Sequence, residues 1–384
     1  MIKMPTLRSK NIILIFILII SGFTISIFLR DHHPATEIKN STSAYDTYEY
    51  GQGDQEKVVD FGTQPNAIFT SESLFHDRIL QRQLAANGWS LREHRFRNGK
   101  DMVPYTDGRL DVMVLGDLPA YVAMSTNKVG IFAVCRQGYN TLVASHRITP
   151  PELKGLRVGY PALTTAHFAI DRALTSANLT LEDVISVPMA PDEMEAAMRS
   201  HTVDAIVSWE PTASSVLAIP GCAAISVSEG FSYISMDLDF TGRHPDIQKA
   251  VLAAVVRAAM WARQDEKNIR THLQWDWKAA TLFVGNSPVE PNAKWISLLR
   301  KETIDNPSFP MLPLNFCNEN GLQHQQFKFL VKNKALSDNT RWQKICDNVN
   351  THLLPEVIKD SQTWMINHYD YSSEKLYQGK EVSP

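Results

Sequence analysis

The chain has 384 residues, 44% of them hydrophobic, which is enough for one large or two medium-sized folded cores. Its formal net charge is −3 and no Lys/Arg run stands beside an aromatic ladder, so the composition argues against nucleic-acid binding. Its four cysteines form no Cys-x-x-Cys pair, and we therefore expect no metal site. If the chain is exported, Cys317 and Cys346 can pair, but four cysteines allow three pairings and free buried thiols are the alternative.

An apolar segment near the N-terminus predicts membrane targeting. Residues 11–29 carry no charged side chain and follow three basic residues. At about 1.5 Å per residue, the segment can cross most of a bilayer core. It is longer than the apolar part of a usual signal peptide and leads directly into Arg30, so an uncleaved anchor is favoured over cleavage near Ser26. Residues 1–30 are thus predicted as a cytoplasmic start and transmembrane anchor, and the polar, aperiodic residues 31–56 as a flexible tether.

From residue 57 onward, strand and helix patterns alternate, which is typical of an α/β fold with parallel strands. Strands that each precede a helix are predicted at 58–62, 109–115, 157–160 and 203–207. Two further strands are predicted at 129–134 and 140–145, and a return strand at 231–238. The corresponding helices are predicted at 71–86, from 164 to about 174, from about 191 to 199, and 244–263.

Polar or small residues follow several of these strands, and ligands of open α/β sheets bind outside the carboxyl ends of the strands. The candidate ligand-binding residues are Gln64, Gly116, Asp117, Thr164, Thr165, His167, Ser208, Trp209 and Glu210. Gly116 lets backbone amides approach a ligand, and Asp117 and Thr164 are predicted helix caps. The amides and dipole at the helix start after Thr164 favour an anion without help from Lys or Arg.

Each candidate has a structural alternative. Trp209 can simply pack at the edge of the fold, and Glu210 can be a solvated acid. A lone helical histidine such as His167 is more often a structural hydrogen-bonding residue than a ligand contact. The loop around Gln64 can be ordinary turn chemistry.

Three stretches resemble the periplasmic substrate-binding proteins of the nitrate, sulfonate and taurine ABC-transporter family. They are residues 108–119, 152–159 and 189–211, and the run that ends in Ser-Trp-Glu-Pro is the most specific. The resemblance covers residues 57–263 and is loose beyond residue 285. It implies a two-lobed type II periplasmic-binding-protein fold with crossover strands, in which residues 57–147 and 230–384 form lobe I and residues 148–229 form lobe II.

The resemblance also implies a function. A small molecule would bind between the lobes and pass to the permease subunits of an ABC importer, without a cofactor, metal or catalytic residue. Together with the anchor, this predicts a location at the periplasmic, extracytoplasmic face of the inner membrane. The helix starts favour an anion, but Asp117 and Glu210 would repel it unless both acids are paired or the ligand also carries an amine.

Two other functions stay open at this point. One is a ligand-sensing ectodomain with a partner in the membrane. The other is a protein like those of thiamine-pyrimidine biosynthesis, which share the implied fold. The missing pair of nucleophile and base and the export segment weigh against the latter.

Overall fold

The computed structural model describes residues 44–50, 56–64, 69–284, 296–297, 300–301, 305–306 and 308–376. By internal contacts the chain divides into two units, Met1–Thr47 and Tyr48–Pro384. Within the first unit, the structure describes the short helix η1 (Ala44–Thr47). The predicted anchor lies outside the described residues, as does most of the predicted tether. None of the helices in the described part of the chain combines the length and apolar character that crossing a bilayer requires.

One eight-stranded sheet runs through the second unit, in the order β2-β1-β3-β8-β4-β7-β5-β6. Its strands are β1 (Val58–Thr63), β2 (Ser90–Arg95), β3 (Val112–Gly116), β4 (Val129–Ala144), β5 (Arg157–Tyr160), β6 (Ile185–Pro188), β7 (Ala205–Ser208) and β8 (Ala223–Asp237). β1 pairs in parallel with β2 and β3, and β5 pairs in parallel with β6 and β7. β4 and β8 are antiparallel to each other and to their outer neighbours. The sheet is therefore two parallel groups joined by an antiparallel pair.

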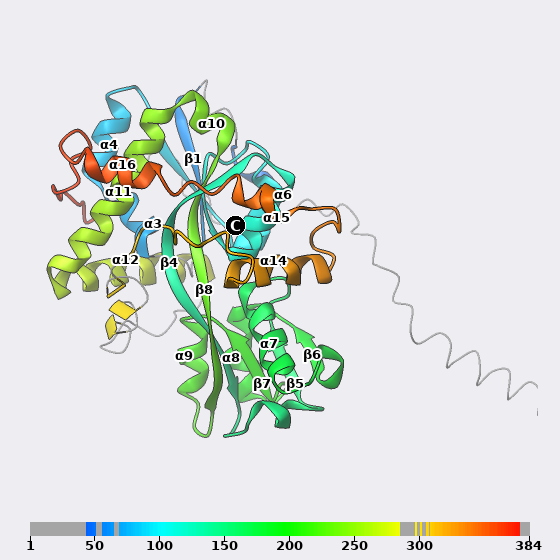
Figure 1. Cartoon of the computed structure of the whole chain (residues 1–384). Coiled ribbons are helices and arrows are strands. Elements are labelled where there is room, and N and C mark those ends of the chain that lie inside the picture. Colours follow the sequence, from blue (N-terminus) through cyan, green and yellow to red (C-terminus); the bar gives the residue numbers. More distant parts are fainter. Residues whose placement is uncertain are drawn as a thin grey trace, which may run out of the picture. The chain divides into compact units, whose positions relative to one another are not determined.

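The two joining strands are long, β4 with 16 residues and β8 with 15, and they run through both groups (Figure 1). They are the crossover strands that the resemblance implied. The prediction of two separate strands at 129–134 and 140–145 was wrong. Residues 136–139 continue the ladder with β8, in spite of nearby register shifts, because the partner strand supplies hydrogen bonds along the whole length.

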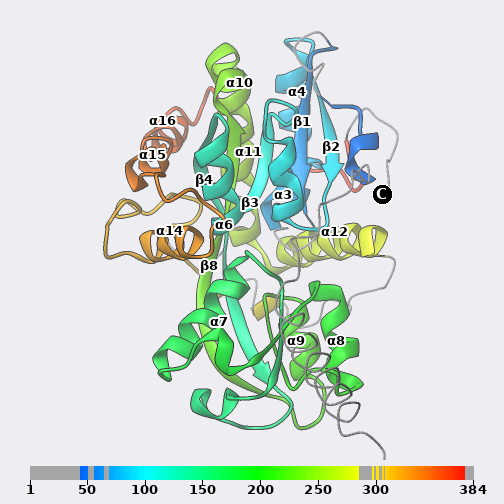
Figure 2. The same cartoon turned by 90° about the vertical axis from the view of Figure 1, so that its right-hand side faces the viewer.

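Helices surround each strand group (Figures 1 and 2). Those associated with β1–β3 are α3 (Phe69–Leu74), α4 (Arg78–Ala85), α5 (Gly99–Met102), η2 (Val103–Tyr105), α6 (Asp117–Thr126), α10 (Leu238–Arg243), α11 (Pro245–Gln264) and α12 (Glu266–Val284). Those associated with β5–β7 are η3 (Pro150–Leu153), α7 (Thr165–Ser176), η4 (Leu181–Asp183), α8 (Pro191–Arg199) and α9 (Thr212–Leu217). The predicted helix 71–86 is two helices, because Asp77 caps a new start by accepting from the amides of Ile79 and Leu80.

The two strand groups have separate hydrophobic cores. Around β1–β3, buried side chains of the sheet pack against α11, through residues such as Val251 and Val255. Around β5–β7, two smaller clusters pack against α7 and α8. These cores agree with a two-lobed arrangement, although the residue boundaries of the lobes stay a prediction.

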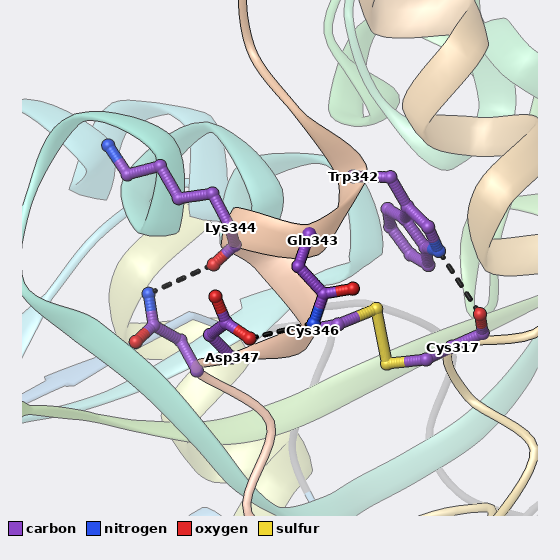
Figure 3. The surroundings of a disulfide bond; sticks show 7 residues. Cys317, Trp342, Gln343, Lys344, Cys346 and Asp347 are labelled. Carbon is purple, nitrogen blue, oxygen red and sulfur yellow. Dashed lines mark hydrogen bonds between the residues drawn. A yellow bond between two sulfur atoms is a disulfide. The ribbon is translucent and has the colours of Figure 1, made fainter.

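The C-terminal region adds α14 (Leu322–Lys332), α15 (Trp342–Cys346) and α16 (Leu353–Lys359). A disulfide joins Cys317 to Cys346, while Cys135 and Cys222 are free thiols. One of the three pairings that the sequence left open is thus present. Figure 3 shows the disulfide next to Trp342, whose Nε1 donates to the carbonyl oxygen of Cys317 over 3.2 Å.

Candidate ligand-binding site

Two helices begin at the carboxyl ends of parallel strands, one in each strand group. α6 follows β3 directly, with Gly116 as its N-cap, and α7 follows β5, with Thr164 as its N-cap. The prediction of Asp117 as a helix cap was wrong: Asp117 is the first residue of α6, and its N-cap Gly116 has no side chain that could bond to the first-turn amides. The side chain of Thr164 does not bond to the first-turn amides of α7 either; its hydroxyl donates to the carbonyl oxygen of Pro161, 2.7 Å away. Uncapped amides and the positive end of the helix dipole together attract negative charge.

A small cavity of about 60 Å³, partly open to solvent, lies where these two helices begin. It is lined by Gln64, Asn98, Gly99, Lys100, Gly116, Pro119, Arg136, Gly138, Tyr139, Asn140, Thr164, Thr165, Trp209, Gly230, Phe231 and Ser232. These residues come from both strand groups and from both crossover strands.

The two crossover strands contribute neighbouring segments to the cavity, residues 136–140 of β4 and 230–232 of β8. Arg136 pairs with Ser232 and Gly138 with Gly230 in the ladder between β4 and β8, so these residues share one face of the sheet. A side chain at Gly138 would place its Cβ 3.1 Å from Nε of Arg136. The guanidinium therefore lies close to this bare backbone, and glycine leaves room for it.

The cavity lining carries positive charge. Arg136 and Lys100 are cationic, and no aspartate or glutamate is among the lining residues. Arg136 is 9% exposed, so its charge acts in surroundings of low dielectric constant, where Coulomb interactions are stronger than in water. An anion in this cavity therefore meets two cations and two helix N-termini.

Five of the nine predicted residues line the cavity: Gln64, Gly116, Thr164, Thr165 and Trp209. Nε2 of Gln64 donates to the carbonyl oxygen of Val114 at 2.9 Å, and Oγ1 of Thr165 donates to Oδ1 of Asn140 at 3.1 Å. These bonds hold the side chains in place, whereas their contact with a ligand remains a prediction.

Asp117 is fully buried and does not line the cavity. Its Oδ1 accepts from the hydroxyls of Tyr233 (2.6 Å) and Tyr121 (3.3 Å), and its Oδ2 accepts from the amide of Phe231 (2.7 Å) and Nε2 of Gln326 (3.0 Å). Burial raises the pKa of Asp117 to about 6, although the four hydrogen bonds lower it. The carboxyl group holds the cavity wall from behind, through Phe231.

His167 is also placed behind the wall. Its ring stacks on Tyr160 with centroids 4.7 Å apart, and its Nδ1 accepts from the amide of Leu163 at 3.2 Å. Burial lowers the pKa of His167 to about 4, so the ring is neutral at pH 7 and Nε2 carries the proton. These contacts are those of a structural, hydrogen-bonded histidine, which was the alternative to a ligand contact.

Ser208 and Glu210 do not line the cavity either. Ser208 is completely buried at the end of β7. Oε2 of Glu210 accepts from the amide of Ser214 at 3.0 Å, in the first turn of α9. The acid is therefore engaged with a helix start, which favours negative charge, and the repulsion expected from Glu210 does not arise at the cavity surface.

Sequence reasoning missed Arg136 and Asn140. Both lie on β4, with Gly138 between them. Arg136 fell in the predicted connection between two strands, and Asn140 was predicted only as the start of the strand 140–145. The alternation of residues 136, 138 and 140 is the period of two that a strand requires. This alternation was the available signal. Sequence reasoning also missed Lys100 and Phe231, for which the local sequence offers no comparable signal.

Residues 87–275 match the model of the NMT1-like family. The matched segment is slightly less than half of the chain, and it contains every cavity residue except Gln64. A binding protein of Brucella abortus (strain 2308) is 23% identical over 198 residues, which are 49% of this chain and 60% of that relative. The chain thus matches less than two thirds of the length of this curated relative.

Two solved structures share the fold. The periplasmic aliphatic sulphonate binding protein SsuA of Escherichia coli aligns with a TM-score of 0.61 and 18% identity, over 75% of this chain and 91% of that one. The periplasmic nitrate-binding protein NrtA of Synechocystis PCC 6803 aligns with a TM-score of 0.54 and 14% identity, over 80% and 90%. The resemblance predicted from the sequence is confirmed, and the mixed α/β fold is that of the periplasmic binding proteins.

The fold is not confined to binding proteins. The desulfurization enzyme DSZB aligns with a TM-score of 0.54 and 14% identity, over 79% of this chain and 99% of that one. The fold by itself therefore does not separate binding from catalysis.

Proposed function

We propose that this NMT1-like chain is an extracytoplasmic solute-binding protein that captures a small organic anion between its two strand groups and delivers it to an ABC importer. The observation that carries the proposal is the charge of the cavity: Arg136, Lys100 and two helix N-termini, with no acidic side chain among the lining residues. A sulfonate or a similar oxyanion matches these donors, because guanidinium groups and helix amides both bind oxyanions.

The same cavity argues for an anion without an amine. Asp117 and Glu210 were the reasons to consider an amino-substituted ligand, and both are hydrogen-bonded away from the cavity surface. Trp209 and Phe231 supply apolar lining instead, which suits a hydrocarbon group on the ligand. We therefore expect a short alkanesulfonate to bind better than taurine, whose ammonium group would have no carboxylate partner.

A ligand panel tests the proposal. The full-length chain in detergent is heated with methanesulfonate, butanesulfonate, taurine, nitrate or sulfate, and its unfolding temperature is measured. A ligand at 100 times its dissociation constant adds about 2.7 kcal/mol to the free energy of unfolding. Stabilisation by an alkanesulfonate above that by taurine supports the proposal. Stabilisation by none of these anions, or by taurine alone, contradicts it.

Arg136 is the residue whose replacement matters most. Arg136→Gln removes a desolvated charge that donates to the anion, so we expect the dissociation constant of the best panel anion to rise by at least about tenfold. Arg109→Gln is the matched control, because Arg109 pairs with Asp107 on the surface and does not line the cavity. Isothermal titration calorimetry measures both. Equal affinity in the two variants would show that Arg136 does not bind the anion.

The proposed delivery to an importer rests on the resemblance and on the predicted anchor, residues 11–29. Together they support a location of the binding unit at the periplasmic face of the inner membrane, tethered by the segment 31–56. Co-purification from native membranes separates transport from sensing. Recovery of ABC permease subunits supports transport, whereas recovery of a sensor kinase supports the sensing ectodomain.

The relationship in fold to a desulfurization enzyme makes catalysis a specific alternative. The cavity lining contains no cysteine, histidine or carboxylate to act as nucleophile or general base. We therefore expect that a bound sulfonate or sulfinate is returned unchanged after long incubation. Release of sulfite, detected by ion chromatography, would show an enzyme instead.

A further inference from the structure

The helix α14 contacts both α6 and α7, and in Figure 1 it lies between them. α6 belongs to one strand group and α7 to the other, and each begins at the cavity, with Gly116 and Thr164 as N-caps. α14 therefore touches the two helices whose N-termini form the anion site. Its residues follow the cavity residues by at least 90 positions in sequence, so this placement is a tertiary feature.

On the side of α6, Gln326 is the contact. Its Nε2 donates to Oδ2 of Asp117 at 3.0 Å, and its Oε1 accepts from the hydroxyl of Tyr121 at 3.2 Å. Gln326 is completely buried. Since the same Oδ2 accepts from the amide of Phe231 at 2.7 Å, Gln326 supports a cavity residue through one intervening carboxylate.

On the side of α7, Phe329 is the contact. Its ring meets the ring of His167 edge to face, with centroids 4.9 Å apart, and the ring of Phe168 at 5.5 Å. Lys332, one turn further along, forms an ion pair with Asp171 at 3.0 Å. These partners lie in the first two turns of α7, directly behind the cavity residues Thr164 and Thr165.

A disulfide anchors the segment that contains α14. Cys317 precedes the helix in the sequence and Cys346 follows it, and Figure 3 shows the bond between them. Trp342, next to the disulfide, packs on His324 and Phe327 of α14, with ring centroids 5.2 and 5.4 Å apart. The helix is therefore held by a covalent link as well as by packing.

We propose that Gln326 and Phe329 are positioning residues, which hold the two walls of the cavity in binding geometry from one disulfide-anchored helix. The ligand-free cavity is then already assembled, and less ordering of the walls opposes binding. Loss of either residue loosens one wall and lowers the affinity for the anion, although neither side chain lines the cavity. The effect on affinity rests on the proposed function, whereas the effect on the walls does not.

Hydrogen–deuterium exchange of the full-length, ligand-free chain tests the positioning directly. Gln326→Ala is compared with Gln325→Ala, an exposed glutamine on the same helix. We expect Gln326→Ala to speed exchange in the peptide around Phe231 by about tenfold, because local opening sets the rate, and to leave β5 and β6 unchanged. Equal exchange in the two variants overturns the proposal, as does uniform acceleration over the whole chain.

A second pair tests the other wall, and its conservative change protects the fold. Phe329→Leu is compared with Phe327→Leu, since both rings are buried on α14 but Phe327 faces Trp342. We expect faster exchange at the start of α7 only in Phe329→Leu. Identical exchange there in both variants means that α14 is ordinary packing, and the proposal fails.

Affinity separates this proposal from the proposed function. With methanesulfonate as the probe, Gln326→Ala and Phe329→Leu should raise the dissociation constant about tenfold through faster dissociation, and Gln325→Ala and Phe327→Leu should not. If the wild-type chain binds no anion, the proposed function fails while the exchange results still decide the positioning. If all four variants bind equally, the positioning role is overturned. Reduction of the disulfide should speed exchange both around Phe231 and at the start of α7. Unchanged exchange in both places overturns the anchoring role of the disulfide.

Discussion

Asp117 shows how one side chain changes its meaning between sequence and structure. As a cap after a strand it was predicted to face the ligand, yet its carboxylate accepts four hydrogen bonds inside the protein. Three of the donors belong to residues at least 114 positions away. The residue remains at the site, but it acts on the wall and not on the ligand.

The raised pKa of Asp117 predicts that the stability of the fold depends on pH. The folded protein holds a proton on this carboxyl up to about pH 6, whereas the ordinary pKa is 3.8. The folded state therefore binds more protons in this window, and the contribution of Asp117 to stability falls as the pH rises from about 4 to above 6. This difference in pKa corresponds to about 3 kcal/mol.

Asp117→Asn removes this dependence, because the amide stays neutral and its oxygen can still accept from Phe231 and Gln326. The wild type loses stability as the pH rises and the variant does not. We therefore expect the free energy of unfolding of the variant minus that of the wild type to increase by about 3 kcal/mol from pH 4 to pH 8. Urea unfolding at a series of pH values measures it. A difference that is constant with pH, or that changes in the opposite direction, contradicts the prediction.

At the scale of elements, the strand β8 has to pass close to the start of α7. A side chain at Gly230 would place its Cβ 2.9 Å from Nδ2 of Asn140 and 3.4 Å from Cβ of Thr165. Real Cβ atoms do not approach other atoms so closely, so one of these cavity residues would have to move. The glycine is thus required by the junction between a crossover strand and a helix start.

Gly230→Ala should therefore weaken binding of the best panel anion by about tenfold, the equivalent of about 1.4 kcal/mol. Gly242→Ala in α10 is the control, because its added Cβ meets nothing within 4 Å and alanine stabilises a helix by up to about 1 kcal/mol. Calorimetric titration and thermal unfolding compare the two. Unchanged affinity in Gly230→Ala would mean that the junction tolerates the methyl group.

At the scale of the whole molecule, the C-terminal end is attached to the first helices of the fold. Nζ of Lys375 lies 2.6 Å from Glu72 and 2.9 Å from Glu93, and both carboxylates are almost completely buried. The amide of Leu376 donates to the carbonyl oxygen of Phe75 at 2.6 Å. Lys375 thus pairs with two buried acids from the N-terminal part of the fold, and Glu93 also pairs with Arg95 at 3.2 Å.

Lys375→Met should destabilise the protein by about 3–5 kcal/mol, because it removes the ion-pair partner of the buried carboxylate of Glu72. Glu93 keeps its pair with Arg95. Lys334→Met is the control: its pair with Asp338 is exposed, and such pairs contribute about 0–1 kcal/mol. Urea unfolding at pH 7 gives both values. A loss below about 1 kcal/mol in Lys375→Met would show that the two acids are stabilised without the lysine.

Local patterns in the sequence determined the alternating strands and helices, the helix starts at Gly116 and Thr164, and the tip that carries Trp209. These features depend on periodicity, caps and turns, which act between near neighbours in the chain. The same patterns carried the resemblance to the sulfonate- and nitrate-binding proteins.

Only the tertiary structure decided which of these residues face the cavity. The continuity of β4, and with it the place of Arg136, depends on hydrogen bonds from β8, about 95 residues further along the chain. The removal of Asp117 from the cavity surface depends on donors that packing brings to it from distant residues. A buried carboxylate requires such partners, and no local pattern specifies a partner on a distant element such as α14.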